Sequence, residues 1–286
     1  MSWPPHSSTA SGWRPKLIAL DIDGTLLAWI EGLGQTLEVV TEPVRDSIRR
    51  AAAAGAHIVL ASGRSAHAMT PVADALGLPL EDQGRLWIVA SNGAVVTRYP
   101  PLEVVHEEVF DARDAVSRIV AARPEVLVAV EERGLGYRVN RPFPEGELTG
   151  EQIVTTVEEM VADPVARVVI RDPDSSPEDF MELGREVGLE GISYHVGWTA
   201  WLDLAPIGIS KAAGLAYVLD ELDLKPTDVL AIGDGRNDIE MLEWAGRGVA
   251  MGQATDDVKE VADAITLPVE EDGAAVEIDR WFPTGG

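Results

Sequence analysis

The stretch KLIALDIDGTL, residues 16–26, joins a buried-strand pattern to two carboxylates. Lys16–Asp23 is apolar almost throughout until it reaches Asp21 and Asp23, which is typical of a parallel strand covered on both faces. The i, i+2 spacing places both carboxylates on the same side of an extended chain. Gly24 then permits a sharp turn. The stretch therefore predicts a central strand whose carboxyl end presents two acidic side chains.

Other apolar runs end in the same way, in small or polar residues. They are His57–Gly63, Trp87–Asn92 and Val229–Asp234. Helical patterns separate the runs, at Glu42–Ala54, Ala66–Leu76, Lys211–Leu222 and Asp238–Trp244. The alternation of strands and helices predicts the α/β class, with a doubly wound parallel-sheet (Rossmann-like) core.

More than a hundred residues separate the third and fourth of these strands, which is enough for a domain of its own (about 50–200 residues). This insertion has strand patterns near Val104–Val109, Leu127–Glu131, Gly136–Asn140, Ala166–Arg171 and Ile192–Leu204. Its helical patterns lie near Ala112–Ala122, Gln152–Val161 and Pro177–Val187. We expect a discontinuous core over 16–95 and 204–286, an α/β cap over 96–203, and a disordered leader over 1–15.

Composition narrows the classes of function. The chain has 286 residues, no cysteine and a formal net charge of −25. The lack of cysteine excludes disulfides, zinc–thiolate sites and thiol catalysis. The five histidines are scattered without a metal-binding spacing, so a metal would need oxygen ligands, as Mg²⁺ prefers. Strong negative charge repels nucleic acid and anionic lipid, and no apolar run approaches the ~20 residues that cross a bilayer. We therefore expect a cytoplasmic protein that binds neither nucleic acid nor membrane.

Ligands of open α/β sheets bind at the carboxyl ends of the strands. Polar groups follow all four strands here, namely Asp21 and Asp23, then Ser62 and Arg64, then Asn92, and then Asp234, Asn237 and Asp238. Turn and capping roles could explain any one of these groups, but they explain all four strands together poorly. The acidic pair suits either divalent metal binding or a nucleophile with an acid/base partner.

Lys211 stands in the first turn of a predicted helix, where the helix dipole disfavours a cation. A solvated surface lysine is the ordinary alternative, but this position favours an anion-binding role. The stretch GDGRND, residues 233–238, precedes another helix, and its carboxylates could complete a magnesium shell or cap that helix.

Together these stretches resemble the haloacid dehalogenase superfamily of phosphohydrolases, in its Cof-type subfamily. The motifs occur in order as DIDGTLL from Asp21, ASGR from Ala61, the lysine of ISK at Lys211, and GDGRNDIEML from Gly233. SNGA from Ser91 and VAMG from Val249 also resemble subfamily signatures. The resemblance covers nearly the whole chain and implies an enzyme that hydrolyses phosphomonoesters with Mg²⁺.

The resemblance also implies a role for each motif residue. Asp21 is similar to the nucleophile, and Asp23 is similar to the acid/base that serves the leaving group and then water. The implied phosphate-binding residues are Ser62, Gly63, Arg64, Asn92, Lys211 and Asn237. The implied metal ligands are Asp21, Asp23 through its backbone carbonyl, Asp234 and Asp238.

The substrate is expected to be a small phosphomonoester such as a sugar phosphate or a phosphorylated cofactor, and the enzyme a monomer or homodimer. Cap residues that could recognise it are Arg138, Arg141, Arg171, His195, Trp198 and Trp201, and Arg236 is a further candidate in the core. Gln253 departs from the subfamily, which commonly has Asn there. A phosphosugar mutase, a non-catalytic phosphate-binding protein and a response-regulator receiver are the alternatives. The receiver fits least, because the third strand ends without a carboxylate.

Overall fold

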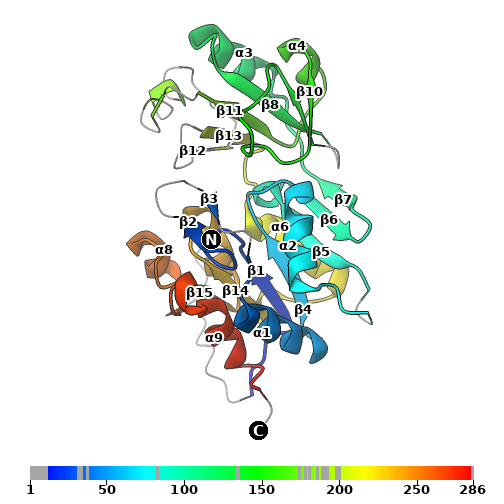
Figure 1. The fold of residues 1–286 in the computed structure, drawn as a ribbon, viewed down its shortest axis with the longest axis vertical. Coiled ribbons are helices and arrows are strands. Elements are labelled where there is room, and N and C mark those ends of the chain that lie inside the picture. The colour runs from blue at the N-terminus through cyan, green and yellow to red at the C-terminus, as the bar shows by residue number, and fades with distance from the viewer. Residues whose placement is uncertain are drawn as a thin grey trace. The chain divides into compact units, whose positions relative to one another are not determined.

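The computed structural model describes residues 12–30, 35–36, 39–81, 84–132, 136–172, 175–176, 179, 182–184, 187, 193–196 and 201–284. The chain divides into two compact units, which are unit 1 (Met1–Glu103 and Ser210–Gly286) and unit 2 (Val104–Ile209). Each unit is built around a sheet of its own (Figure 1). In the part of the chain that the structure describes, no helix is both long enough and apolar enough to cross a membrane.

The sheet of unit 1 has the strand order β16-β15-β14-β1-β4-β5-β6-β7. At its centre, β1 (Leu17–Leu20) pairs in parallel with β14 (Val229–Gly233) and with β4 (His57–Ala61). All four residues of β1 are fully buried, as the continuous apolar run predicts. The remaining strands are β5 (Leu86–Ala90), β6 (Val95–Tyr99), β7 (Glu103–Glu107), β15 (Arg247–Ala250) and β16 (Ala264–Ile265).

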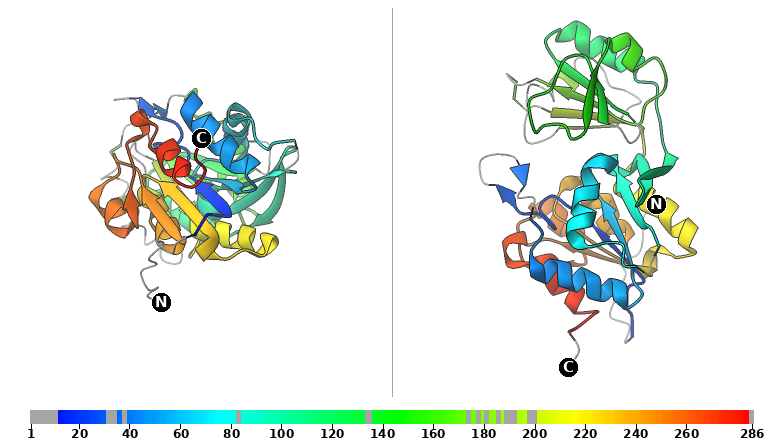
Figure 2. Two further views of the ribbon diagram at one scale, coloured as in Figure 1. Left: turned by 90° about the horizontal axis from the view of Figure 1, so that it is seen from below. Right: turned by 45° about the vertical axis from the view of Figure 1, so that its right-hand side comes forward.

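Helices cover both faces of this sheet (Figure 2). On one face, α1 (Glu42–Ala53) contacts both α2 (Ala66–Leu76) and α9 (Gly273–Asp279), and on the other α6 (Lys211–Leu222) contacts α7 (Ile239–Trp244). This arrangement confirms the predicted doubly wound α/β class. The smaller elements are β2 (Trp29–Ile30), β3 (Gln35–Thr36), α8 (Asp256–Val261), η1 (Ser91–Gly93), η2 (Pro226–Asp228), η3 (Arg236–Asp238) and η4 (Val269–Glu271).

A tight turn after β5 changes where the first part of unit 1 ends. Ser91 and Asn92 have φ of 51° and 53°, in the left-handed region, and the chain then returns as β6 antiparallel to β5. The expected boundary at residue 96 therefore falls inside a strand of this sheet. The compact units instead divide within β7, at Glu103 and Val104.

The end of the expected leader is also tied to unit 1. Trp13 packs edge-to-face on Trp281 at 4.7 Å between ring centroids, and its indole N–H donates to the Thr227 carbonyl at 2.9 Å. The guanidinium of Arg14 lies 4.2 Å from the Phe282 ring centroid. Residues 12–15 are thus placed by contacts with the C-terminal segment, because the two tryptophans bury each other. Residues 1–11 lie outside the described residues.

Unit 2 contains a sheet with the strand order β10-β9-β8-β11-β13-β12. Alternate residues of its strands enter separate clusters on the two faces, with Val128 and Val130 on the face covered by α3 and Ala129 on the other. The elements of unit 2 are α3 (Arg113–Ala122), β8 (Leu127–Glu132), β9 (Gly136–Val139), β10 (Glu151–Val154), α4 (Val157–Met160), β11 (Val168–Arg171), β12 (Ser193–Val196) and β13 (Trp201–Ala205).

Two predictions for unit 2 are wrong in detail. The helix predicted over Gln152–Val161 is a strand, β10, followed by the short helix α4, because β10 pairs in parallel with β9 and Thr156 caps α4 with Glu159. The single strand predicted over Ile192–Leu204 is an antiparallel pair, β12 and β13. Part of the helix predicted over Pro177–Val187 lies outside the described residues.

Candidate active site

The predicted site residues meet where the central parallel strands end. Asp21 follows β1, Ser62 follows β4 and Asp234 follows β14, while Asn92 lies in η1 directly after β5. These four strands are neighbours in the sheet, and β1 pairs in register with β4 and β14. Since parallel strands bring their carboxyl ends to one edge, segments far apart in the sequence contribute to one cluster.

Lys211 is the centre of this cluster. Its side chain is fully buried, and its Nζ donates to Asp21 Oδ1 and to Asp238 Oδ1, each at 2.6 Å. The helix that carries it begins at Ser210, whose hydroxyl accepts from the Ala213 N–H. A buried ammonium requires such partners, because the desolvation of an unpaired charge is costly. The surface-lysine interpretation is therefore wrong.

The charges of the cluster do not balance, because one ammonium faces two carboxylates. Burial raises the pKa of Asp21 well above its usual value, and the nearby Asp238 adds to this effect more than Lys211 offsets it. Burial alone would lower the pKa of Lys211, but Asp21 and Asp238 outweigh it and hold that pKa above its usual value. Lys211 thus stays protonated, and Asp21 holds a proton more readily than an ordinary aspartate does.

Asp238 holds the loop that carries Asp234. Its Oδ2 accepts from the backbone N–H groups of Asp234 and Gly235, at 3.0 and 2.9 Å, while its Oδ1 accepts from Lys211. The side chain is fully buried. The same carboxylate thus shapes the loop and binds the lysine, without capping α7, and its role as a metal ligand stays a prediction.

Asp23 lies beside Arg64. The Arg64 guanidinium binds the Asp23 carboxylate with two nitrogens, Nε to Oδ2 at 2.9 Å and Nη2 to Oδ1 at 2.6 Å. Such a two-point contact fixes the plane and direction of a carboxylate. Arg64 was predicted at the phosphate, and the structure brings it to the predicted acid/base instead.

Ser62, Asn92 and Asn237 form the side of the cluster next to Arg64. The Ser62 hydroxyl accepts from the Arg64 N–H at 3.2 Å, and the Ser62 carbonyl accepts from the Asn92 N–H at 3.1 Å. The Asn237 amide donates to Asn92 Oδ1 at 2.9 Å. A Cβ on Gly63 would lie 3.1 Å from Asn92 Oδ1, so Gly63 approaches this asparagine closely. Ser62, Gly63, Arg64, Asn92 and Asn237 thus gather after the strand ends, and Lys211 reaches the cluster from the start of α6.

Three carboxylates are close enough to share a cation. One oxygen each of Asp21, Asp234 and Asp238 lies within 4.8 Å of the others. Oxygen donors with surplus negative charge suit a hard cation such as Mg²⁺, so these residues fit the metal that the resemblance implies. Gly24, at φ +82°, allows Asp234 to come close, since a Cβ there would lie 2.1 Å from Asp234 Oδ2. The Asp23 side chain is outside this group of three, and metal binding by its backbone carbonyl stays a prediction.

The sequence interpretation did not assign a role to Gln253. Its Nε2 donates to the Gly24 carbonyl at 2.5 Å and to Asp234 Oδ2 at 3.3 Å, and its Oε1 accepts from the Val269 N–H at 3.1 Å. The only available signal was its position directly after VAMG, where it departs from the subfamily pattern. The residue that departs from the pattern, Gln253, therefore contacts a carboxylate of the acidic cluster.

The substrate-recognition candidates that the structure describes have partners of their own. Arg138 binds Glu132, Arg171 binds Glu147, Arg141 binds Glu125 and Arg236 binds Asp257. Trp201 packs edge-to-face on Phe143, with 6.2 Å between ring centroids. Trp198 and the side chain of His195 lie outside the described residues. These contacts give the described candidates structural roles.

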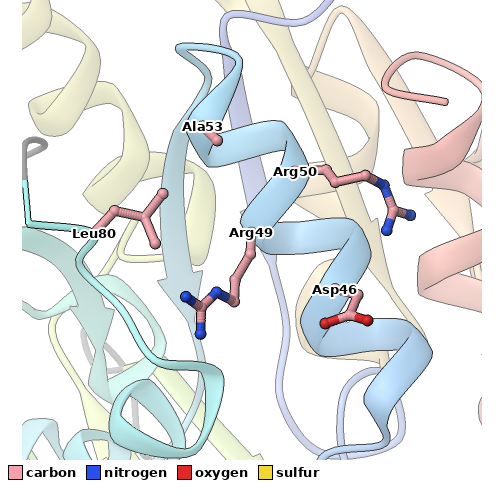
Figure 3. Close-up of a pocket in the computed structure, with 5 residues that line it drawn as sticks. All are labelled: Asp46, Arg49, Arg50, Ala53 and Leu80. Carbon is pink, nitrogen blue, oxygen red and sulfur yellow. The ribbon is translucent and has the colours of Figure 1, made fainter. Parts of the chain in front are cut away.

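A pocket elsewhere in unit 1 contains none of the predicted chemistry. It lies along α1 and is lined by Asp46, Arg49, Arg50, Ala53 and Leu80 (Figure 3). Arg50 is bound to Asp279 at 2.5 Å. The strand-end cluster therefore remains the candidate active site.

Known proteins share this chain's pattern over most of its length. The family pattern of the haloacid dehalogenase-like hydrolases matches residues 18–278. The 5-amino-6-(5-phospho-D-ribitylamino)uracil phosphatase YcsE of Bacillus subtilis is 29% identical, with 93% of this chain and 95% of that protein covered. A phosphoglycolate phosphatase of Natronomonas pharaonis is 31% identical, with 92% and 96% covered.

The fold is also similar to that of a haloacid dehalogenase-like hydrolase of known structure. The crystal structure of a haloacid dehalogenase-like hydrolase from Bacteroides thetaiotaomicron superposes with a TM-score of 0.76 at 27% identity, covering 94% of this chain and all of that one. The family match includes every strand-end motif described above, from Asp21 to Asp238. The chain therefore belongs to the haloacid dehalogenase-like hydrolases.

Proposed function

We propose that this haloacid dehalogenase-like phosphatase hydrolyses a small phosphomonoester with Mg²⁺, by way of a phosphoryl group carried on Asp21. The observation that carries the proposal is the buried triad in which Lys211 faces Asp21 and Asp238. A buried cluster with unbalanced charge lowers the stability of the fold. Phosphoryl transfer explains why such a cluster is present, because that reaction depends on positioned charges.

In the first step, an Asp21 oxygen attacks phosphorus and the ester P–O bond breaks. Asp23 gives its proton to the leaving alkoxide, and Arg64 orients the Asp23 carboxyl for this transfer. Lys211 and the strand-end N–H groups hold the phosphoryl oxygens. Mg²⁺ would bind among Asp21, Asp234 and Asp238 and would neutralise charge on the carboxylates and the phosphate.

In the second step, Asp23 takes a proton from water as that water attacks the phosphorus of the phospho-Asp21. The P–O bond to Asp21 breaks, inorganic phosphate leaves, and Asp21 returns as a carboxylate. The proton that Asp23 gives to the leaving group in the first step is replaced by the one it takes from water in the second, so the steps balance.

We propose a sugar phosphate or a phosphorylated cofactor as the substrate. One named relative supports this class, since the phosphate in its name is borne on a ribityl chain. The other name, phosphoglycolate, supports only the broader class of small phosphomonoesters. We further propose that unit 2 is the cap and sets the preference among substrates, because it is inserted between strands whose ends carry the site.

The test is phosphate release from sugar phosphates, phosphoglycolate, nucleotides, flavin mononucleotide and pyridoxal phosphate, with Mg²⁺ or with excess chelator. Mg²⁺-dependent release from at least one of them is expected, with Asp21→Asn as the inactive control. Isomerised sugar phosphate without free phosphate would indicate a mutase instead. Equal activity in chelator would contradict the proposed metal.

A further inference from the structure

The Gln253 side chain joins three loops of unit 1. Its amide nitrogen contacts the Gly24 carbonyl in the turn after β1 and an Asp234 carboxylate oxygen after β14. Its amide oxygen accepts from the Val269 N–H at the start of η4. One side chain therefore spans the two loops that carry the predicted metal ligands and anchors both to a third.

The orientation of this amide follows from its partners. Val269 offers an N–H, so the amide oxygen must face it, and Gly24 and Asp234 offer only acceptor oxygens, so the NH₂ must face them. A flipped amide would place oxygen against two acceptors and NH₂ against a donor. The hydrogen-bond network thus allows one orientation.

We propose that Gln253 is a positioning residue that sets the affinity for Mg²⁺, because it holds Asp234 and the Asp23–Gly24 turn at one separation. The proposal rests on the proposed function, and in particular on Asp234 as a metal ligand. Groups that orient metal ligands in this way typically change metal affinity about 10- to 100-fold when they are removed. Gln253 is exposed and lies between structural elements, so its loss should cost little stability.

Isothermal titration calorimetry of the full chain with Mg²⁺ alone measures this directly, in the absence of substrate. Gln253→Ala removes the amide, and Gln253→Met keeps the length without hydrogen bonds. We expect both variants to raise the Mg²⁺ Kd by about tenfold or more. The control is Thr255→Ala, two residues further along the chain, whose hydroxyl donates to Asp257 at 2.5 Å rather than to Gly24 or Asp234; the Mg²⁺ Kd should stay within roughly threefold of wild type.

Two further measurements separate positioning from mere structure. The Tm in chelator should match wild type for both Gln253 variants, and the substrate KM at saturating Mg²⁺ should stay within roughly threefold while the apparent Mg²⁺ constant rises. An unchanged Mg²⁺ Kd in both variants would overturn the inference, as would a Kd that rises only together with a lowered Tm. If wild type itself bound no Mg²⁺ and released no phosphate, the proposed function would fail as well.

Discussion

The two units of the molecule use charged side chains in opposite ways. In unit 1 one buried ammonium, Lys211, faces Asp21 and Asp238, and a third carboxylate, that of Asp234, lies nearby. In unit 2 each arginine discussed above meets one carboxylate, as Arg167 meets Asp203 with two hydrogen bonds of 3.0 Å. These arginines of unit 2 are therefore paired one to one with carboxylates, whereas the strand-end cluster of unit 1 has more carboxylates than cations.

The comparison suggests two uses of charged side chains. The ion pairs of unit 2 contribute to stability, and under the proposed function the strand-end cluster of unit 1 contributes to catalysis. Arg167, directly before β11, and Asp203 in β13 neutralise each other beside two paired strands. The cluster in unit 1 gathers groups from Asp21 to Asp238, and under the proposed function a cation and a phosphate would add their charges to it. Substitutions should accordingly affect rate in unit 1 and stability in unit 2.

Asp21→Asn should have the largest effect. The amide keeps the shape of the carboxylate but cannot attack phosphorus, so we expect kcat to fall by more than about a hundredfold with the fold retained. Steady-state kinetics and circular dichroism measure the two parts. Arg171→Ala in unit 2 is the control and should leave the rate with a small aryl phosphate within about tenfold. A comparable loss of kcat in both variants would contradict the proposed difference between unit 1 and unit 2.

Metal dependence should distinguish the members of the unit 1 cluster. Asp234→Ala removes a metal-binding oxygen, whereas Lys211→Ala removes a neighbouring positive charge and no ligand. We expect Asp234→Ala to weaken Mg²⁺ binding at least about tenfold more than Lys211→Ala does, as measured by calorimetry. Equal weakening would show that Asp234 is not a ligand.

Arg167→Ala should act on stability alone. The Arg167 and Asp203 side chains are 8% and 16% exposed, and breaking such a pair strands a buried carboxylate at a cost of about 3–5 kcal/mol. Arg141→Ala breaks an exposed pair and should cost less than about 1 kcal/mol. Urea unfolding measures both, and equal costs would contradict the assignment of Arg167 to the core of unit 2.

Asp21→Asn should also stabilise the protein when Mg²⁺ is absent, which is a smaller effect. Because the pKa of Asp21 is raised in the folded state, that state binds more protons than the unfolded state between the two pKa values. Wild-type stability should then fall as pH rises from the ordinary Asp range through the raised pKa, and the variant should lack this loss. Melting curves in chelator across pH test it, and identical pH profiles would count against it.

The strand-end cluster could be predicted from the sequence because parallel strands align their carboxyl ends. Asp21, Ser62, Asn92 and Asp234 needed only this rule and the apolar runs before them. The partner of each side chain could not be predicted in this way. Arg64 binds Asp23, and Gln253 spans two loops, because contacts between loops depend on packing that no local pattern records.

The same limit explains an error in unit 2 and the misplaced boundary in unit 1. Residues 152–161 have a helical pattern, but Glu151–Val154 forms an edge strand because β9 is available to pair with it. Val95–Tyr99 likewise joins β5 only after the left-handed turn at Ser91 and Asn92 reverses the chain. Non-local pairing decides such segments, and it outweighs local propensity.

The most direct test of the account is to trap the phosphoryl group on Asp21. In Asp23→Asn an aryl phosphate needs little help as a leaving group, so Asp21 should still attack, but no base remains to activate water. Mass spectrometry after mixing with substrate and Mg²⁺ should find one added phosphoryl group, located on Asp21 and absent in chelator. Turnover without a modified Asp21, or a phosphoryl group on another residue, would contradict the account.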